Sequence, residues 1–457
     1  MSKSRAKART AKTLPEDQIV DVLGDVALPG EVEDFAAALL QQKRNVIRRR
    51  REIPAEILPL PTTPVPWYDL GHRPTVESPK PSRFLCYAAG DYYVQDAGSL
   101  LVLAALGADT SALRGQLICD LCAAPGGKAS ALVEAIGAGS HDGGGFVLAN
   151  EVIRSRIGAL QMNLARTGSD RFAVSNLDPD ALADRLSGVF DIVVVDAPCS
   201  GQAMVGRGKQ KVSSLSKNQI QHSASRQSRI LDAAVRLLRD GGKLVYSTCT
   251  FAQAENEAHA VRLMDAGIVE SELIERLAPY ESRAGCYRLW PHIHDCAGSF
   301  AASLRVNEGG PLGTRRRRDQ DQAKLPVDLS QWYGSFAETT RLRVRDSVIF
   351  GWPSDAPDWV EDVAVAGPEL AHRAGQTWKP SHAAALRRVP RAASLQAIEI
   401  DDPMAKVYLR GEPIGCDGNG WHVVRLGGRP LGWLKGNGSL GKNHLPTAAR
   451  MQGELTS

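Results

Sequence analysis

Two cysteines follow apolar, strand-like runs and enter turns built from small or hydroxyl residues. Cys249 follows the run 244–248, and Cys199 stands in Asp-Ala-Pro-Cys-Ser-Gly (196–201) after the run 190–195. Most cysteines are simply buried as small hydrophobic residues, so position matters more than residue type. A free thiol has a pKa of about 8.5 and needs nearby positive charge or helix N-termini to attack at neutral pH. These two thiols are the candidate reactive groups.

A third strand-like run ends at Asp120 and opens into a turn rich in small residues. The candidate cofactor residues in this turn are Cys122, Ala123, Ala124, Pro125, Gly126, Gly127 and Lys128. Glycines let the backbone approach a ligand closely, and the helix that follows offers free N–H groups. The spacings of the two common phosphate-binding motifs, G-x-x-x-x-G-K-[ST] and G-x-G-x-x-G, are absent. An ordinary tight turn between strand and helix is the alternative interpretation.

Acidic residues follow the next two predicted strands. Glu151 is placed to accept hydrogen bonds from ribose hydroxyls, as acids do in dinucleotide-binding folds. Asp178 is a candidate partner for the amino group of an adenine. Alone, Glu151 is equally explained as a helix-start acid and Asp178 as a turn aspartate. Together with the turn before Lys128, they favour a cofactor that contains a nucleoside.

The middle of the chain alternates strands and helices. Strands are predicted over 117–121, 145–149, 172–175, 190–196 and 243–247, and helices over 99–106, 127–136, 154–166, 218–238 and 254–264. Near-continuous apolar strands separated by helices predict a mostly parallel sheet with helices on both faces. Ligands bind at the carboxyl ends of such strands. The two thiols, the turn and the two acids all lie at such ends.

A thiolate, a carboxylate and a nucleoside cofactor together suit methylation of an unreactive ring carbon. The C5 atom of cytosine is too electron-poor to attack a methyl sulfonium directly. Addition of a thiolate to C6 gives an enamine in which C5 is nucleophilic, and Asp196 is placed to hold the N3 proton. A base then removes the C5 proton so that the thiol can leave. The spacing does not decide which cysteine attacks and which assists.

The chain has 457 residues and a formal net charge of only +4, so the placement of charge matters more than its sum. Basic residues cluster at 3–12, 48–51 and 315–318. There is no signal peptide and no long apolar stretch, which predicts a cytoplasmic protein with free thiols and no membrane partner. Cys119 and Cys122 form a lone C-x-x-C pair without a second pair, so no metal site is expected.

The flanking regions are less periodic than the middle of the chain. Residues 31–51 fit a helix, and the proline-rich stretch 54–81 reads as an extended connection with little regular structure. Beyond residue 326, short strands are predicted over 406–409, 421–426 and 431–434, which indicates a small β-rich domain.

Three motifs in order, 120–128, 196–201 and Ser-Thr-Cys-Thr (247–250), resemble those of the NOL/NOP/Sun family of RNA cytosine-C5 methyltransferases. The resemblance covers residues 67–306. In the C-terminal region, Lys-Pro-Ser-His-Ala (379–383), Tyr-Leu-Arg-Gly-Glu (408–412) and Gly-Trp-Leu-Lys-Gly (432–436) resemble the bacterial 16S ribosomal RNA methyltransferase F group. The last of these segments resembles a PUA-like domain.

The resemblance implies a fold, a cofactor and residue roles. It implies a Rossmann-like class I methyltransferase domain with a small N-terminal segment and a C-terminal PUA-like α+β RNA-binding region. The cofactor would be S-adenosyl-L-methionine, held by residues 122–128, Glu151 and Asp178. Asp196 and Lys128 would line the pocket shared with the target base. Cys249 would be the nucleophile, and Cys199 would assist product release.

The resemblance also divides the chain into regions. They are a basic tail (1–30), an N-terminal RNA-binding segment (31–90), the methyltransferase domain (91–306), a linker (307–325), an intermediate domain (326–400) and a PUA-like domain (401–450). The expected partner of this monomer is ribosomal RNA or the small-subunit particle. A transfer RNA substrate, or a non-catalytic assembly factor that keeps the fold, is the alternative. A methyltransferase acting on DNA or a small molecule fits the basic segments and the PUA-like tail less well.

Overall fold

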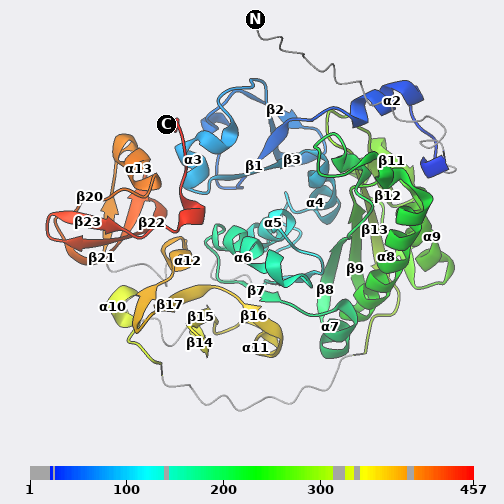
Figure 1. The fold of residues 1–457 in the computed structure, drawn as a ribbon. Coiled ribbons are helices and arrows are strands. Elements are labelled where there is room, and N and C mark those ends of the chain that lie inside the picture. The colour runs from blue at the N-terminus through cyan, green and yellow to red at the C-terminus, as the bar shows by residue number, and fades with distance from the viewer. Residues whose placement is uncertain (1–20, 24–25, 138–143, 312–324, 334–339, 389–395) are drawn as a thin grey trace, which may run out of the picture.

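The computed structural model describes residues 21–23, 26–137, 144–311, 325–333, 340–388 and 396–457 (Figure 1). The expected basic tail (1–30) and linker (307–325) fall mostly outside these ranges. Within them, no helix combines the length and the apolar character that crossing a membrane requires.

A mixed sheet forms the centre of the molecule, and it has ten strands in the described part of the chain. Nine of them run in the order β11-β12-β13-β9-β8-β5-β6-β7-β16, and β10 pairs with β13. The parallel strands are β5 (Leu117–Asp120), β6 (Phe146–Asn150), β7 (Phe172–Ser175), β8 (Phe190–Asp196) and β9 (Leu238–Thr248). The antiparallel strands are β10 (Val269–Ser271), β11 (Glu281–Arg283), β12 (Cys286–Leu289), β13 (Ser299–Val306) and β16 (Ala364–Ala366).

Helices cover both faces of this sheet, as the alternating pattern predicts. They are α4 (Leu101–Leu106), α5 (Gly127–Ala135), α6 (Ile157–Ala165), α7 (Pro179–Leu186), α8 (Lys217–Leu237) and α9 (Glu257–Asp265). Figure 1 shows α4 and α5 on one side of the strands and α8 and α9 on the other. The run Val193–Val195 in β8 is fully buried, because a strand covered on both faces exposes neither set of its alternating side chains. The predicted α/β fold is therefore confirmed.

The N-terminal segment contains more strand than the sequence suggests. Helix α2 ends at Leu39 (Val32–Leu39), and β1 (Asn45–Arg49) follows, so the helix predicted over 31–51 is wrong in its second half. The stretch 54–81, predicted to have little regular structure, contains β2 (Thr62–Val65) and β3 (Tyr68–Pro74). With β4 (Tyr92–Asp96) these strands form a sheet in the order β2-β3-β1-β4.

Burial of a charged residue explains the error over 31–51. Arg48 is only 2% exposed, pairs with the carboxylate of Glu134 and donates a hydrogen bond to Ser130. A run of arginines looks like a solvated helix face when the partner that permits burial lies far along the chain. Here Val46, Ile47 and Arg48 are all buried in a strand.

Two further sheets occupy the C-terminal third. The first has the order β14-β15-β17-β18, and the second has the order β19-β21-β22-β23-β20. Their strands are β14 (Thr340–Arg345), β15 (Val348–Pro353), β17 (Glu369–Ala374), β18 (Thr377–Pro380), β19 (Ala397–Glu399), β20 (Ile414–Gly415), β21 (Asn419–Leu426), β22 (Arg429–Asn437) and β23 (Leu440–Asn443). The helices of this region are α10 (Ser330–Tyr333), α11 (Val360–Val363), α12 (His382–Ala385) and α13 (Asp402–Leu409). A further short helix, α3 (Leu85–Ala88), precedes β4 in the N-terminal segment.

One C-terminal prediction is wrong. Residues 406–409, expected to be a strand, form the last turn of α13, whereas the strands predicted over 421–426 and 431–434 are present within β21 and β22. Asp401 caps α13 by accepting a hydrogen bond from the backbone N–H of Met404. An aspartate N-cap followed by a proline in the first turn is a helix-start signal. The apolar residues within 406–409 favoured a strand instead, which led to the wrong prediction.

Candidate active site

The ends of β5, β8 and β9 bring the predicted groups to one edge of the central sheet. Asp196 of β8 pairs in register with Ser247 of β9, and the Ser247 hydroxyl donates a hydrogen bond to Asp196 Oδ1 at 2.8 Å. Lys128, in the first turn of α5, reaches Asp196 Oδ2 at 2.6 Å. Burial opposes the charge of Lys128, but the attraction of Asp196 outweighs it and raises the pKa of Lys128 above its ordinary value. The ammonium and the carboxylate therefore form a charged pair.

The two candidate thiols face each other across neighbouring loops. Cys199 follows β8 and Cys249 follows β9, and their Sγ atoms lie 3.2 Å apart. Both cysteines are free thiols, each partly exposed. The hydrogen bond to Cys249, and then burial, raise the pKa of Cys199 well above the ordinary value for a thiol.

A buried carboxylate joins the two thiol loops. Glu255 is fully buried and accepts hydrogen bonds from the Ser200 backbone N–H at 2.9 Å and the Ser200 hydroxyl at 2.5 Å. It also accepts from Gln227 Nε2 at 2.9 Å and lies 3.5 Å from Thr250 Oγ1. Burial raises the pKa of Glu255 even though these donors favour its charged form. Because Ser200 follows Cys199 and Thr250 follows Cys249, this carboxylate sets how close the thiols lie.

A second buried carboxylate lies beside the charged pair without a hydrogen-bond partner. Asp120, the last residue of β5, is fully buried, and neither of its side-chain oxygens has a partner among the described residues. Burial and the negative charge of Asp196 raise the pKa of Asp120 to about 7, against the attraction of Lys128. Asp120 therefore resists ionisation near neutral pH, and a cation bound nearby would favour its charged form.

The predicted cofactor turn is held by side chains from α6 and the loop before it. Arg156 donates to the Ala124 carbonyl at 2.5 Å, and Asn163 donates to the Pro125 carbonyl at 2.7 Å. Gly126 has φ +109°, a conformation that side-chain-bearing residues rarely adopt. The shape of the turn is therefore set by its surroundings as well as by its glycines.

The two predicted cofactor acids differ in their surroundings. Glu151 is buried directly after β6, accepts a hydrogen bond from the Ile153 N–H at 2.8 Å and pairs with Arg156 at 3.1 Å. Asp178 is exposed and caps α7 by accepting from the Asp180 N–H at 3.0 Å. Arg156 links Glu151 to the cofactor turn, whereas Asp178 belongs to the loop after β7.

The N-terminal helix α2 packs on the loop that carries Cys249. The Phe35 ring meets Phe251 edge-on with centroids 4.9 Å apart, and Phe251 stacks on Trp290 at 5.9 Å. Helix α2, which lies outside the predicted methyltransferase domain (91–306), thus packs directly on the loop of Cys249.

Sequence reasoning did not select Asp120, Glu255 or Asn150 as site residues. Asn150 donates to the carbonyl of Leu121, at 3.3 Å, and to that of Leu177, at 3.0 Å, and so ties the loops after β5 and β7 together. All three are polar residues at or just beyond the ends of predicted strands or at the start of a predicted helix. A polar residue at such a position, where a core residue is usually apolar, is the sequence signal that could have identified them.

Two family descriptions match the sequence. Residues 111–305 match 16S rRNA methyltransferase RsmB/F, and residues 395–451 match the methyltransferase RsmF PUA domain. The chain is 29% identical to a protein of Shigella boydii named ribosomal RNA small subunit methyltransferase F, over 93% of this chain and 94% of the relative. Proteins of Escherichia coli with the same name match to the same extent.

Solved structures share the fold. A methyltransferase homolog protein from Pyrococcus horikoshii has a TM-score of 0.53 and 24% identity, covering 64% of this chain and 93% of that one. NSun6 from Pyrococcus horikoshii with SFG has a TM-score of 0.52 and 19% identity, covering 64% of this chain and 97% of that one. These likenesses show that about two thirds of the chain shares the fold of those structures.

We expect Glu255→Ala to destabilise the protein by about 1–3 kcal/mol, because the buried Ser200 N–H and the Gln227 amide lose the carboxylate oxygen that both donate to. Urea unfolding at neutral pH measures the change. The control is Glu270→Ala, at an exposed position of β10, which should stay within ~0.5 kcal/mol of wild type. If Glu255→Ala is as stable as the control, Glu255 does not hold the thiol loops.

The raised pKa of Asp120 predicts a pH-dependent stability. In the unfolded chain an aspartate has a pKa of about 4, whereas in the folded protein the pKa of Asp120 is about 7. Its contribution to stability is therefore complete below about pH 4 and is lost as the pH rises through about 7. Asp120→Asn cannot ionise, so from about pH 5 to about pH 8 it should lose about 1–3 kcal/mol less stability than wild type.

Urea unfolding of both proteins across this pH range tests the prediction for Asp120. Asp265→Asn, at an exposed position in α9, is the matched control and should follow the wild-type curve. Parallel curves for wild type and Asp120→Asn would show that Asp120 does not titrate in this range.

Proposed function

The chain belongs to the family of 16S rRNA methyltransferases that includes RsmB and RsmF, and we propose that it methylates C5 of a specific cytosine in ribosomal RNA. It is an RNA methyltransferase by family and fold. The observation that supports cytosine C5 as the target is the pair of thiols, 3.2 Å apart, beside the Lys128–Asp196 ion pair. Two thiols and a carboxylate are the groups that C5 chemistry requires.

Cys249 is the nucleophile in this proposal. Its Sγ atom adds to C6 of the cytosine, the C5–C6 double bond becomes single, and C5 gains the electron density to accept a methyl group. The assignment follows the resemblance of Ser-Thr-Cys-Thr (247–250) to the nucleophile segment of the NOL/NOP/Sun family, and it leaves Cys199 next to the adduct, with its Sγ atom 3.2 Å from that of Cys249. After methyl transfer, Cys199 acts as the base in its thiolate form, its own proton having passed to solvent. It takes the C5 proton, the C–H electron pair restores the C5–C6 double bond, and the electron pair of the Cys249–C6 bond returns to the Cys249 sulfur.

Asp196 and Lys128 stabilise the charge that builds up on the ring. When the thiol adds to C6, N3 of the cytosine becomes basic, and a carboxyl group at Asp196 can hold the proton there. Lys128 keeps this carboxylate oriented through its 2.6 Å contact, and Ser247 holds the other carboxylate oxygen at 2.8 Å. Both carboxylate oxygens are therefore already positioned before substrate binds.

The residues present fit S-adenosyl-L-methionine, whose sulfonium supplies the methyl group when it is bound. Asp120 and Asp196 share the single ammonium of Lys128, and the pKa of Asp120, raised to about 7, shows that full ionisation of both carboxyl groups is not compensated. A cationic ligand would balance that charge. The turn 122–128 would hold the amino-acid part, Glu151 the ribose and Asp178 the adenine.

RNA is the partner that the flanking regions fit. The match of residues 395–451 to a PUA domain supports RNA binding by the C-terminal region, and the N-terminal segment 31–90 adds exposed arginines, Arg44 and Arg51. In this proposal the enzyme is a cytoplasmic monomer acting on small-subunit ribosomal RNA. The target base must leave its stack to reach Cys249, so a loop or an assembly intermediate suits it better than regular duplex.

Cys249→Ala should reduce methylation of small-subunit ribosomal RNA by at least ~1,000-fold, because no thiol is left to attack C6. Bisulfite sequencing of ribosomal RNA from a strain lacking the gene should show one lost 5-methylcytosine, restored by wild type and not by Cys249→Ala. Cys286→Ala, buried in β12 away from the site, is the control and should restore it. Full activity of Cys249→Ala would disprove the mechanism, and a lost mark in transfer RNA would redirect the substrate.

Cys199→Ala should accumulate a covalent protein–RNA adduct, because addition to C6 and methyl transfer proceed while release is blocked. A band of reduced mobility in denaturing gels, sensitive to ribonuclease, detects it. The double variant Cys199→Ala, Cys249→Ala should give no such band. An adduct formed instead by Cys249→Ala would mean that the roles of the two thiols are exchanged.

A further inference from the structure

A row of one tryptophan and two lysines crosses the C-terminal sheet. Trp421 of β21 pairs with Lys435 of β22, and Lys435 pairs with Lys442 of β23. Directly paired residues on adjacent strands project from the same face, so the three side chains are neighbours. Lys435 Nζ lies 5.7 Å from the centre of the Trp421 ring. Both lysines are exposed, and the tryptophan is partly exposed.

His444 extends this row with a second ring. Its centroid lies 4.4 Å from that of Trp421. Burial, followed by repulsion from Lys379, Lys442 and Lys435, lowers the pKa of His444 to about 4. The imidazole is therefore neutral at physiological pH and forms, with the indole, an uncharged aromatic surface ringed by cations. We call Trp421, His444, Lys379, Lys435 and Lys442 the aromatic–lysine platform.

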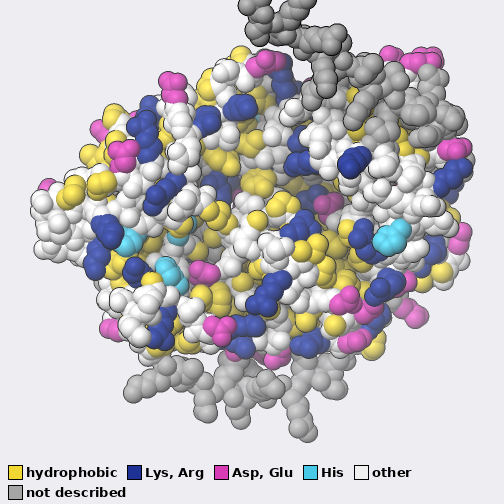
Figure 2. Space-filling model, viewed as in Figure 1, with side chains coloured by type: hydrophobic (Ala, Val, Ile, Leu, Met, Phe, Trp, Pro, Cys, Tyr) yellow, Lys and Arg dark blue, Asp and Glu magenta, His cyan; other side chains and the backbone are white. Residues whose placement is uncertain are grey.

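The lysines of the platform have no close carboxylate partner in the described part of the chain. Among the residues that the structure describes, none of Lys379, Lys435 and Lys442 forms an ion pair with a carboxylate. Figure 2 shows Lys, Arg and His side chains gathered over this part of the molecule, with few acidic side chains between them. Three cations close enough to act on one imidazole create a positive potential that favours a polyanion.

The platform is rigid because it rests on a core shared by two sheets. Trp433 of β22 lies edge-on to Trp421 with centroids 6.2 Å apart and donates its indole N–H to the Ser381 carbonyl at 2.8 Å. The same core contains Leu370 of β17 and Val423 of β21. Lys379 in β18 therefore stays in place relative to the C-terminal sheet, and the platform spans the junction between the two.

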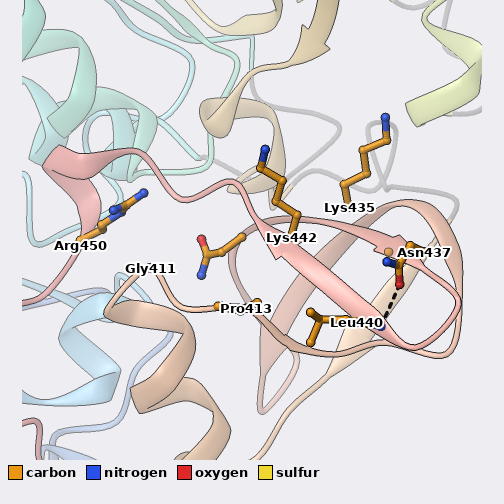
Figure 3. Close-up of a pocket in the computed structure, with 9 residues that line it drawn as sticks. Gly411, Pro413, Lys435, Asn437, Leu440, Lys442 and Arg450 are labelled. Carbon is orange, nitrogen blue, oxygen red and sulfur yellow. Dashed lines mark hydrogen bonds between the residues drawn. The ribbon is translucent and has the colours of Figure 1, made fainter.

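A pocket continues from the platform along the C-terminal sheet (Figure 3). Its volume is about 550 Å³, and Lys435 and Lys442 line it together with Asn437, Leu440 and Arg450. Figure 3 shows the two lysines projecting from neighbouring strands, with Arg450 on the opposite side. Arg450 lies against Gly411, where an added Cβ would stand 2.6 Å from Arg450 Nε. Lysines shared by platform and pocket make them one continuous surface.

We propose that this surface binds an unpaired, single-stranded segment of the RNA substrate, with one base stacked on Trp421 and adjacent phosphates on Lys435 and Lys442. A neighbouring nucleotide enters the pocket beside Arg450. The proposal rests on the proposed function, since it takes RNA as the substrate. Aromatic rings recognise bases by their flat faces, and these faces are free only where RNA is unpaired.

Lys435 can leave the face of the Trp421 ring and so make room for a base. Its ammonium now lies over the Trp421 ring, in the place that a stacked base takes, and it sits on a flexible, exposed side chain. A base that displaces the ammonium brings a phosphate with it, so the lysine exchanges a cation–π contact for an ion pair. The indole keeps a partner in both states.

The experiment uses the full-length protein and a fluorescein-labelled, single-stranded RNA of roughly ten nucleotides. Fluorescence anisotropy measures affinity over a series of salt concentrations. Trp421→Ala should bind at least about fivefold more weakly, and Trp421→Phe should keep most of the affinity. The double variant Lys435→Gln, Lys442→Gln should lower the slope of log affinity against log salt by about 1.4, or ~0.7 for each lost phosphate contact. Arg283→Gln, at an exposed position on β11, is the charge control and should leave the affinity and the salt slope unchanged.

Two results would overturn the proposal. One is wild-type affinity and salt slope in the double lysine variant. The other is tighter binding of a matched RNA hairpin than of the single strand, with no loss in Trp421→Ala. Thermal unfolding checks that each variant folds. If Trp421→Ala does not fold, the affinities of Trp421→Phe and of the double lysine variant decide whether the platform binds RNA. Methylation of ribosomal RNA by the wild-type protein is measured separately. Absence of methylation contradicts the proposed function, whereas unchanged RNA binding by the platform variants contradicts only the platform.

Discussion

The position of both thiols depends on one buried carboxylate. Glu255 lies beyond β9, yet its hydrogen bonds reach the loop after β8 through Ser200 and the loop after β9 through Thr250. Parallel neighbouring strands bring two loops to the same edge of a sheet, but they do not fix the loops to within an ångström. The carboxylate does so, because a buried acceptor that loses a donor has no water to replace it. The Sγ–Sγ separation of 3.2 Å follows from that constraint.

Charge imbalance is the second constraint on the site. Asp120 and Asp196 lie close enough to Lys128 for all three charges to interact, and burial makes the excess negative charge costly. The raised pKa of Asp120 relieves part of that cost through protonation. In the proposed function, a cationic cofactor bound nearby would relieve it without protonation, so the charge imbalance would favour binding of that cofactor.

The sequence predicted those features that depend on local pattern and missed those that depend on distant partners. The strands that deliver Asp196 and the two thiols were predicted because near-continuous apolar runs are typical of a doubly covered sheet. The strand at 45–49 was missed because burial of Arg48 depends on Glu134, far away in the sequence. Asp120 stands first in the motif 120–128 and Glu255 near the start of a predicted helix, but the complete burial of these carboxylates is a tertiary property that their local positions do not reveal.

The C-terminal sheets are joined to the central sheet by contacts that fix their orientation. Strand β16 pairs with β7 at the edge of the central sheet, and the indole of Trp352 donates to the Phe172 carbonyl at 2.9 Å. Trp359 packs on Phe146 and Phe190, beneath the strands that end at the site.

These contacts have a consequence for substrate selection. A platform carried on a flexible linker would raise the local concentration of RNA without selecting any nucleotide. A platform fixed through β16 and the tryptophans holds an unpaired segment at a set distance from Cys249. In this proposal, specificity for one cytosine comes from the length of RNA between the stacked base and the thiol, and the central sheet sets that length.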